Sequence, residues 1–461
     1  MANRHLDMLR NAFKNILGDF SAVGCSPCYP GSPSDLDRPY WGGSRGEVYD
    51  MPMKWSPLGF LTTIELGTPK QELTIFVDWT WVSFIVMTNR CNGVYNQSAC
   101  FFPDQITWDP RKSSSLKNLS SVYDDYTWRP NHFFFEYPMH VTIGSDSLEV
   151  GPVTKDTVLQ LSDLTFDTEV LGQVFPFSGI FGLSPVFEGD GLDYQSPIYQ
   201  QWKQGAWKEP VAGFVYCHDN STKHVCDGND GIQTIGGIRT DLIRNNKIWW
   251  YDVEKYIDVN SLDFVYDPPV YNYWAVELES LSLGTEEQKV EPTSNESGKA
   301  AIFDHASYGR GAPLTPNAYM RLVNITHANP VKPKSPPNNG EQAFYSVDCS
   351  KVATFPEIKY KFVGQDKVWV ITSKNYVEKL GDGSCVLNIR TLATGDKFIG
   401  NFGETFAIDK YITLDWENLR VGISDARIIV LNKDSPRLDL QAVGTIKAVV
   451  GGVRLRKGEG V

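Results

Sequence analysis

The sequence predicts an all-β protein built from two related lobes. Most of the 461 residues form short runs rich in aromatic and β-branched side chains, with turn clusters between them and few long helical periods. Two apolar runs, Phe60–Asp78 and Ala300–Asp304, each end in a single Asp. A chain of this length is expected to split into at least two hydrophobic cores. We therefore expect two similar halves that each deliver one carboxylate to a shared site.

The first apolar run consists of two strands joined by a turn. Thr63 and Glu65 alternate with apolar neighbours, which is the period of a half-buried strand. The sequence Gly67-Thr68-Pro69 indicates the turn, and the second strand continues to Asp78. An ionised Asp at the end of a buried strand needs hydrogen-bond partners or a chemical role. A pair of such carboxylates favours general acid–base chemistry.

Further motifs follow in a fixed order along the chain. They are Trp108-Asp109-Pro110 with Ser113-Ser114-Ser115, Phe177–Leu183, Ile235–Ile238, Tyr273-Trp274 and Phe398–Gly400. Together with Gly59–Asp78 and Ala301–Asp304, they resemble the pepsin-like aspartic proteases over about residues 57–427. The resemblance implies a bilobed pepsin-like acid protease fold with a cleft between the lobes. It also implies Asp78 and Asp304 as the catalytic pair, a peptide or protein ligand in the cleft, no cofactor or metal, and a monomeric protein.

The residues that follow each Asp depart from the family pattern. The family has Thr-Gly and then Ser or Thr, whereas this sequence has Trp79, Thr80 and Trp81 in the first loop and His305, Ala306 and Ser307 in the second. Trp79 supplies no hydroxyl, and the β-branched Thr80 disfavours positive φ angles. A protonated His305 would favour two ionised carboxylates, which is the wrong state for catalysis. We expect a weakened pair, with Trp79 and Trp81 either packed in the core or filling the floor of the cleft.

The resemblance also implies a hairpin flap that closes over the substrate. Its tip aligns with Ile143, Gly144 and Ser145, so that Ile143 stands where the family has Tyr. An Ile side chain cannot form the hydrogen bond of that Tyr hydroxyl. We therefore expect the flap to close less effectively than in the family.

The eight cysteines predict disulfide bonds and an oxidising compartment. The resemblance implies the pairs Cys91–Cys100 and Cys349–Cys385, and Cys217 and Cys226 bracket a polar loop. Cys25 and Cys28 favour a local disulfide over a redox or zinc site, because no second Cys pair or His pair accompanies them. Five sequons agree with a secreted or endolysosomal glycoprotein, namely those at Asn96, Asn118, Asn220, Asn295 and Asn324.

The termini lie outside the expected lobes. Apolar side chains at helical spacing in residues 1–24 predict an amphipathic helix, either on the surface or as a remnant of the prosegment found in the family's zymogens. No signal peptide is visible there, and we expect an altered N-terminus. Residues 25–57 are expected to be an irregular linker, residues 58–210 and 211–430 the two β lobes, and residues 431–461 a solvated tail.

The charge of the chain argues against several functions. A net charge of −12 disfavours binding to nucleic acid or to an anionic membrane, and no apolar run approaches the roughly 18 residues of a membrane helix. Our leading hypothesis is a pepsin-fold protein that binds a peptide or protein and has weak or no peptidase activity. In this hypothesis, Asp78 and Asp304 are retained for local hydrogen bonding. One alternative is an active aspartic-type endopeptidase that works at acidic pH. Another is a secreted inhibitor or decoy on the same scaffold.

Overall fold

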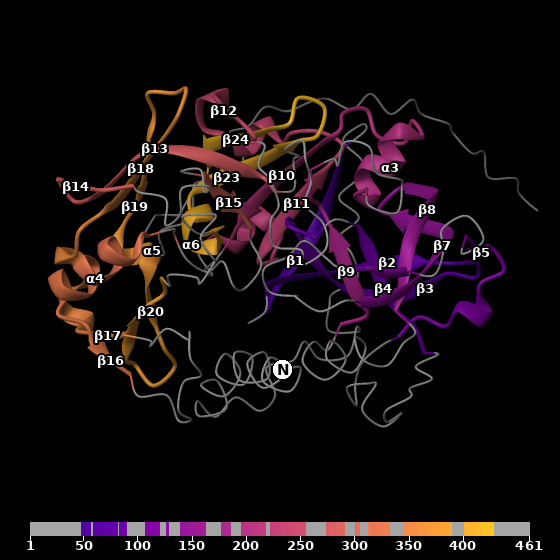
Figure 1. Ribbon diagram of the computed structural model, residues 1–461, viewed down its shortest axis with the longest axis horizontal. Coiled ribbons are helices and arrows are strands. Elements are labelled where there is room, and N and C mark those ends of the chain that lie inside the picture. The colour runs from indigo at the N-terminus through magenta and orange to yellow at the C-terminus, as the bar shows by residue number, and fades with distance from the viewer. Residues whose placement is uncertain are drawn as a thin grey trace, which may run out of the picture.

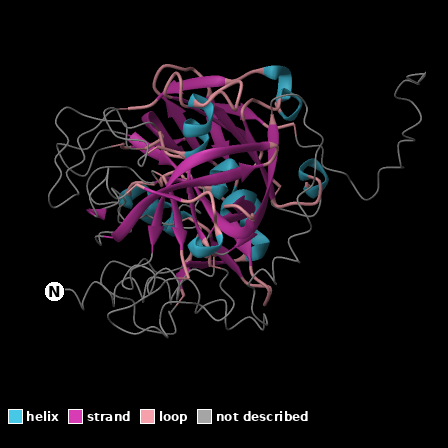
Figure 2. Ribbon diagram, turned by 90° about the vertical axis from the view of Figure 1, so that its right-hand side faces the viewer, coloured by secondary structure: helices cyan, strands magenta, loops and turns pink. Residues whose placement is uncertain are grey.

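The computed structural model describes residues 48–56, 59–81, 83–89, 107–119, 126–128, 139–162, 177–185, 195–217, 222–254, 273–290, 300–304, 312, 314–331, 345–389 and 401–427. Within these ranges strands predominate and the helices are short, as Figure 2 shows. The prediction of an all-β protein is therefore confirmed.

The described strands form three sheets. The largest has the order β12 (Trp249–Asp252), β24 (Arg420–Asp425), β23 (Lys410–Asp415), β10 (Val211–Tyr216), β11 (Gly231–Ile235), β1 (Tyr49–Ser56), β2 (Gly59–Leu66), β3 (Gln71–Asp78), β9 (Gly179–Gly182), β4 (Phe84–Met87), β8 (Val153–Ser162), β7 (Met139–Val150) and β5 (Lys117–Asn118), with β6 (Tyr126–Trp128) paired to β7. The second contains β19 (Val368–Ile371), β18 (Ile358–Phe362), β13 (Ala275–Leu283), β15 (Ala300–Phe303) and β22 (Asn401–Phe402), with β14 (Glu286–Gln288) beside β13. The third contains β16 (Asn329–Pro330), β17 (Tyr345–Val347), β21 (Cys385–Leu387) and β20 (Val377–Lys379). The described α-helices are α3 (Pro197–Lys203), α4 (Pro316–Ile325), α5 (Ser373–Tyr376) and α6 (Glu404–Ala407).

The two halves of the chain occupy opposite sides of the molecule. In Figure 1, strands β2 to β5 and β7 to β9 lie on the right, β13, β14 and β16 to β20 lie on the left, and β10, β11, β15, β23 and β24 lie between them. In each half, the strand that leads to a candidate Asp pairs in parallel with a later strand. Asp78 is opposite Gly182 on β9, and Phe303 is opposite Phe402 on β22. This repeated arrangement agrees with the predicted bilobed fold.

Strand β1 connects the two halves through its neighbours, β11 on one side and β2 on the other. The prediction of an irregular linker over residues 25–57 is therefore wrong for residues 49–56. The alternation of buried Met51 and Met53 is a strand signal, but Pro52 between them lacks a backbone donor and argues against a strand. The rest of that segment, like residues 1–24 and 431–461, lies outside the described residues.

One hydrophobic core runs through both halves. Phe60 of β2 packs edge-on against Phe214 of β10, with ring centroids 5.1 Å apart, and the same buried cluster includes Trp274 and Phe303 of the second half. The main core does not divide between the halves, because β1, β10 and β11 bring their apolar faces together, and two smaller buried clusters lie apart from it.

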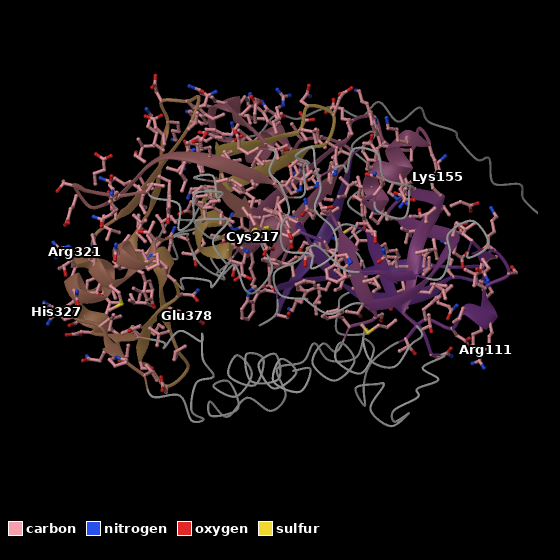
Figure 3. All side chains as sticks on the ribbon, viewed as in Figure 1. Arg111, Lys155, Cys217, Arg321, His327 and Glu378 are labelled. Carbon is pink, nitrogen blue, oxygen red and sulfur yellow. A yellow bond between two sulfur atoms is a disulfide. The ribbon has the colours of Figure 1, made fainter. Side chains whose placement is uncertain are left out.

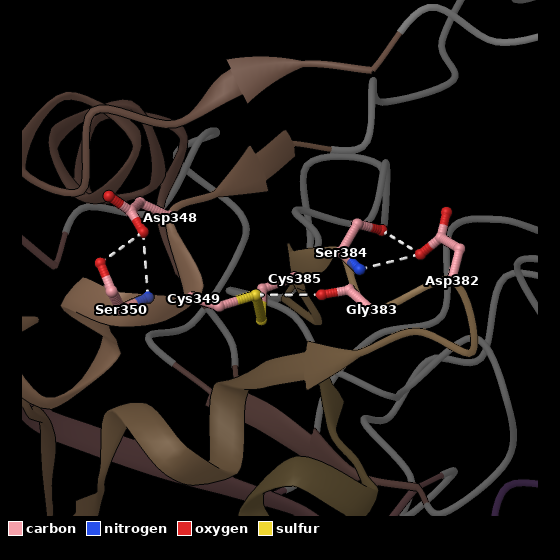
Figure 4. Close-up of a disulfide and its surroundings, with 7 residues drawn as sticks. All are labelled: Asp348, Cys349, Ser350, Asp382, Gly383, Ser384 and Cys385. Atoms are coloured by element: carbon pink, nitrogen blue, oxygen red, sulfur yellow. Dashed lines mark hydrogen bonds between the residues drawn. A yellow bond between two sulfur atoms is a disulfide. The ribbon is translucent and has the colours of Figure 1, made fainter.

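Two of the predicted disulfides are confirmed. Cys217–Cys226 closes the loop between β10 and β11, and Figure 3 places Cys217 near the middle of the molecule. Cys349–Cys385 links the 3-10 turn Cys349–Thr354 to β21. In Figure 4, Asp348 and Asp382 on either side each accept two hydrogen bonds from the Ser two residues later. Cys25, Cys28, Cys91 and Cys100 lie outside the described residues.

Two sequon asparagines fall within the described residues. Asn118 on β5 and Asn324 on α4 are exposed, as a glycan requires, and glycosylation at these positions stays a prediction. Asn96, Asn220 and Asn295 lie outside the described residues. In the part of the chain that the structure describes, no helix is long and apolar enough to span a membrane.

Candidate active site

The two candidate carboxylates lie at the ends of buried strands. Asp78 is the last residue of β3 and is 4% exposed, and Asp304 follows β15 and is 1% exposed. The parallel neighbour strands hold both residues through the backbone. The N–H of Leu183 donates to the Asp78 carbonyl at 2.8 Å, and the N–H of Asp304 donates to the Phe402 carbonyl at 3.0 Å.

Gly182 allows the loop after Asp78 to fold closely against β9. A Cβ atom at this position would collide with the backbone oxygens of Trp81 and Ser83. The N–H of Gly182 donates to the Ser83 carbonyl at 2.8 Å, and the N–H of Ser184 donates to the Trp81 carbonyl at 3.2 Å. The loop is therefore tied at two points to the chain that leaves β9.

A chain of hydrogen bonds connects the two strand ends. The carbonyl of Leu183, whose N–H binds Asp78, accepts a hydrogen bond from Trp274 Nε1 at 2.6 Å. The carbonyl of Trp274 accepts one from the N–H of Phe303 at 2.9 Å, and Phe303 directly precedes Asp304. The backbones at Asp78 and Asp304 therefore belong to one connected network.

Apolar side chains accompany each carboxylate on one face of its strand. Because side chains alternate along a strand, Phe76 lies on the same face as Asp78, and Ile302 lies on the same face as Asp304. Phe76 stacks on Phe177 with ring centroids 5.3 Å apart. Ile302 belongs to a small buried cluster, separate from the main core, with Tyr273, Ala275 and Ala300. Apolar surfaces beside a few placed polar groups are typical of ligand sites.

Thr80 holds the Asp78 carboxylate directly. Its backbone N–H and its hydroxyl both donate to Asp78 Oδ1, each at 2.7 Å. Thr80 is not among the residues with positive φ, so its β-branched side chain imposes no backbone strain. The prediction that Thr80 weakens the support of Asp78 is therefore wrong. This one residue supplies a backbone donor and a hydroxyl donor, which the family pattern divides between a Gly and the Ser or Thr after it.

Both tryptophans of the first loop are buried, at 1% exposure each. Trp79 Nε1 donates to Gln233 Oε1 of β11 at 2.9 Å, and its ring packs edge-on against Phe214 at 5.4 Å. Gln233 is fixed in turn, because its Nε2 donates to the Gly213 carbonyl at 2.8 Å. Of the two alternatives for Trp79, core packing is therefore correct.

The segment predicted as the flap tip is the middle of a strand. Ile143, Gly144 and Ser145 lie inside β7, and the turn to β8 falls at residues 151–152. The flap assignment is therefore wrong.

The first residues of β7, 139–141, pair with β6 before the pairing with β8 begins at Thr142. Strands β6 and β7 thus form a two-stranded arm, whose connection, residues 129–138, lies outside the described residues.

Asn401, which by the family resemblance stands where an acidic residue is expected, contacts the second carboxylate. Its Nδ2 donates to Asp304 Oδ2 at 3.1 Å, and the residue is 3% exposed. The two residues are 97 positions apart, and the sequence signal for Asn401 is its place directly after the motif Phe398–Gly400.

His305, Ala306 and Ser307 lie outside the described residues. Among the described residues, no group of three His, Cys, Asp or Glu side chains could hold a metal ion.

Comparison with known proteins supports the family resemblance independently of the structure. The sequence profile of the family described as eukaryotic aspartyl protease matches residues 59–426. The chain is 47% identical to the aspartic protease-like protein pytH of Aspergillus terreus, over 82% of this chain and 93% of the relative. It is 45% identical to the aspartic protease-like protein pynH of Aspergillus niger, over 82% and 92%. It is 41% identical to a probable secreted aspartic protease of Arthroderma benhamiae, over 88% and 98%.

Proposed function

The chain belongs to the eukaryotic aspartyl protease family, and on this basis we propose that it is an endopeptidase that hydrolyses proteins at acidic pH. Asp78 and Asp304 are its catalytic residues, and the substrate is a peptide segment bound between the two lobes. The observation that carries the proposal is the pair of hydrogen bonds from Thr80 to Asp78 Oδ1. They supply the local support that the unusual loop sequence had been expected to lack.

The proposed reaction needs one proton on the carboxylate pair. Two carboxylates close together do not both ionise readily, so the pair retains a proton at acidic pH. The ionised member removes a proton from a water molecule, which attacks the peptide carbonyl carbon. The protonated member first polarises the carbonyl oxygen and then protonates the leaving amine. The backbone network through Leu183 and Trp274 supports this role, because general acid–base catalysis depends on exact placement of both groups.

A second candidate function is peptide or protein binding with weak or no hydrolysis. It is favoured by the position of Trp79, whose indole N–H is bound to Gln233 in the core and offers no hydroxyl to the second loop. In the family, hydroxyls at this position and its counterpart, here His305, lock the two loops together. An inhibitor or decoy on the pepsin scaffold would be one form of this second function.

We place the protein in an oxidising compartment, either secreted or endolysosomal. The disulfides Cys217–Cys226 and Cys349–Cys385 support this location, since such bonds persist outside reducing compartments. The relative from Arthroderma benhamiae is described as secreted, which agrees with the proposal.

Binding of pepstatin distinguishes the two functions. Transition-state analogues bind at least about 100-fold more tightly than substrates to a competent site. We expect calorimetry at pH 4 to show tight binding to the wild type and binding at least about 100-fold weaker for Asp78→Asn. The matched control is Asp366→Asn, which changes a fully exposed Asp where the pair is buried, and it should bind like the wild type. Weak binding that is equal in the wild type and Asp78→Asn would favour the second function.

A further inference from the structure

We propose that Gln233 is a positioning residue for the first carboxylate and that it acts through the indole of Trp79. In this arrangement the loop that follows Asp78 is held by β11, a strand of the sheet between the two halves. The inference rests on the proposed function and adds a residue that places Asp78 for the reaction from within the core. It follows from the buried contacts of the loop, the indole and the amide.

In the loop after Asp78, Trp79 lies between two residues whose backbone and side-chain atoms are fixed. The Asp78 carbonyl accepts a hydrogen bond from the Leu183 N–H at 2.8 Å. The Thr80 N–H and hydroxyl each donate to Asp78 Oδ1 at 2.7 Å. Because Trp79 is covalently joined to both Asp78 and Thr80, a displacement of Trp79 also displaces the carboxylate and its donors. The position of the indole therefore bears directly on the position of Asp78 Oδ1.

The indole of Trp79 packs on the sheet between the two halves. Its ring lies edge-on against Phe214 of β10, with ring centroids 5.4 Å apart, and its Nε1 donates to Gln233 Oε1 of β11 at 2.9 Å. Phe214 and Gln233 are directly opposite each other in the β10–β11 pairing, so their side chains lie on the same face of the sheet. These strands lie between the two halves in Figure 1. Two neighbouring strands therefore hold the indole, one by packing and one by a hydrogen bond.

Both ends of the Gln233 amide have partners, and these partners fix its orientation. Oε1 accepts from the Trp79 indole, and Nε2 donates to the Gly213 carbonyl at 2.8 Å. An indole N–H can only donate and a carbonyl can only accept, so a half-turn of the amide would set donor against donor and acceptor against acceptor. The side chain is 0% exposed, where unpaired polar atoms are costly. The amide therefore holds the indole N–H at one position.

An apolar side chain at position 233 would fill the core but would not direct the indole. Apolar contacts are not directional, whereas a hydrogen bond constrains both a distance and an angle. A connected and satisfied polar network makes a buried region rigid. A catalytic group has to be held within about 0.5 Å of its productive position. Gln233 serves this requirement for Asp78, in place of the hydroxyl contact that the family makes at position 79.

The chain contains a matched control for this pair of residues. Gln201 on α3 is also 0% exposed. Its Oε1 accepts from Trp207 Nε1 at 3.1 Å, and its Nε2 donates to the Leu148 carbonyl at 3.4 Å. Trp207 is not next to a candidate carboxylate in the sequence. Gln201→Leu therefore removes a buried amide with the same kinds of partner and leaves the loop after Asp78 unchanged.

The first test compares kcat and KM on a fluorogenic peptide at pH 4. Gln233→Leu removes both hydrogen bonds, and we expect it to lower kcat at least about 10-fold while KM changes less than about twofold, because it displaces a reacting group rather than a substrate contact. Gln201→Leu should unfold at lower urea concentration than the wild type, as Gln233→Leu should, but its kcat should stay within about twofold of the wild type.

Gln233→Glu provides a rescue of the same position. Burial raises the pKa of a carboxyl group, so a buried Glu is protonated at pH 4. A protonated Glu at this position can accept from the indole through its carbonyl and donate to the Gly213 carbonyl through its O–H. We therefore expect kcat of Gln233→Glu to lie within about threefold of the wild type at pH 4, well above that of Gln233→Leu.

A second measurement needs no catalysis and keeps the inference separate from the proposed function. The Thr80 amide signal, assigned with Thr80→Ser in protein that carries ¹⁵N-threonine, reports the hydrogen bond to Asp78 Oδ1. We expect Gln233→Leu to shift this signal and to speed its hydrogen exchange at least about 10-fold, and Gln201→Leu to change neither. Trp79→Phe removes the same hydrogen bond from the indole side and should give the same change, so the test stands even where Gln233→Leu does not fold.

Three results would overturn the inference. They are a folded Gln233→Leu that keeps the kcat of an active wild type, an equal loss of kcat in Gln233→Leu and Gln201→Leu, and a Thr80 signal that does not respond to loss of the bond between Gln233 and Trp79. An inactive wild type in which the Thr80 signal responds as expected would reject the proposed function alone.

Discussion

Replacing Trp79 by Thr, the residue that the family pattern has at this position, should lower the free energy of unfolding by about 3–5 kcal/mol. The expected loss is large because the indole is 1% exposed and packs against Phe214 in the core that both halves share. The change also removes the donor to Gln233 Oε1, and a buried polar atom left unpaired costs about 1–3 kcal/mol. Urea unfolding of the two proteins measures the difference.

The control for this variant is Trp79→Phe, which keeps an aromatic ring and removes only the Nε1 donor. We expect it to lose roughly 1–2 kcal/mol, less than the Thr variant, because most of the packing remains. A loss below about 1 kcal/mol in Trp79→Thr would contradict the core position, since a tryptophan on an accessible cleft floor can be truncated at little cost.

Replacing Lys410 by Met should stabilise the protein by about 2 kcal/mol at pH 6. Lys410 is 4% exposed, and its Nζ donates to the carbonyls of Val370 and Ile408, each at 3.3 Å. No salt bridge in the described part of the chain includes it. Burial lowers the pKa of Lys410 from 10.5 to about 8, although the nearby Asp409 and Asp425 oppose that shift. Met fills the same space without a charge.

The gain from Lys410→Met should depend on pH. Below pH 8 the lysine is charged in both the folded and the unfolded protein, so the folded wild type carries the full cost of the buried charge. Between pH 8 and 10.5 the folded protein releases its proton first, and wild-type stability rises relative to the variant. Urea unfolding at pH 6 and pH 10 measures this change, with the exposed Lys374→Met as the control. A change in stability of Lys410→Met that is equal at both pH values, whether gain or loss, would contradict the argument.

The sequence predicted the family and the fold because the order and spacing of the strand motifs survive changes in individual side chains. The same motifs predicted that Asp78 and Asp304 end buried strands, and the family match over residues 59–426 confirms the resemblance. The disulfide Cys349–Cys385 followed from the resemblance in the same way. These are features that depend on local pattern or on position within a known order.

The features that the sequence did not predict depend on contacts between distant residues or on strand register. Thr80 supports Asp78 through a loop conformation that no propensity encodes, and Trp79 finds its partner Gln233 154 positions away. The flap alignment failed because a Gly-containing segment such as Ile143–Ser145 fits a strand interior as well as a hairpin tip. Pairing with β11 and β2 overrides the turn signal of Pro52 in β1.

The most direct test of the account is cleavage of a denatured protein by the full-length chain between pH 3 and pH 6. We expect the wild type to release peptides, and Asp78→Asn and Asp304→Asn each to lower the rate by at least about 100-fold. Asp366→Asn, which changes a fully exposed carboxylate, should retain the wild-type rate. Cleavage by the wild type that is lost in both pair variants is the predicted result. A folded wild type that cleaves no faster than Asp78→Asn would contradict the assignment of a working carboxylate pair.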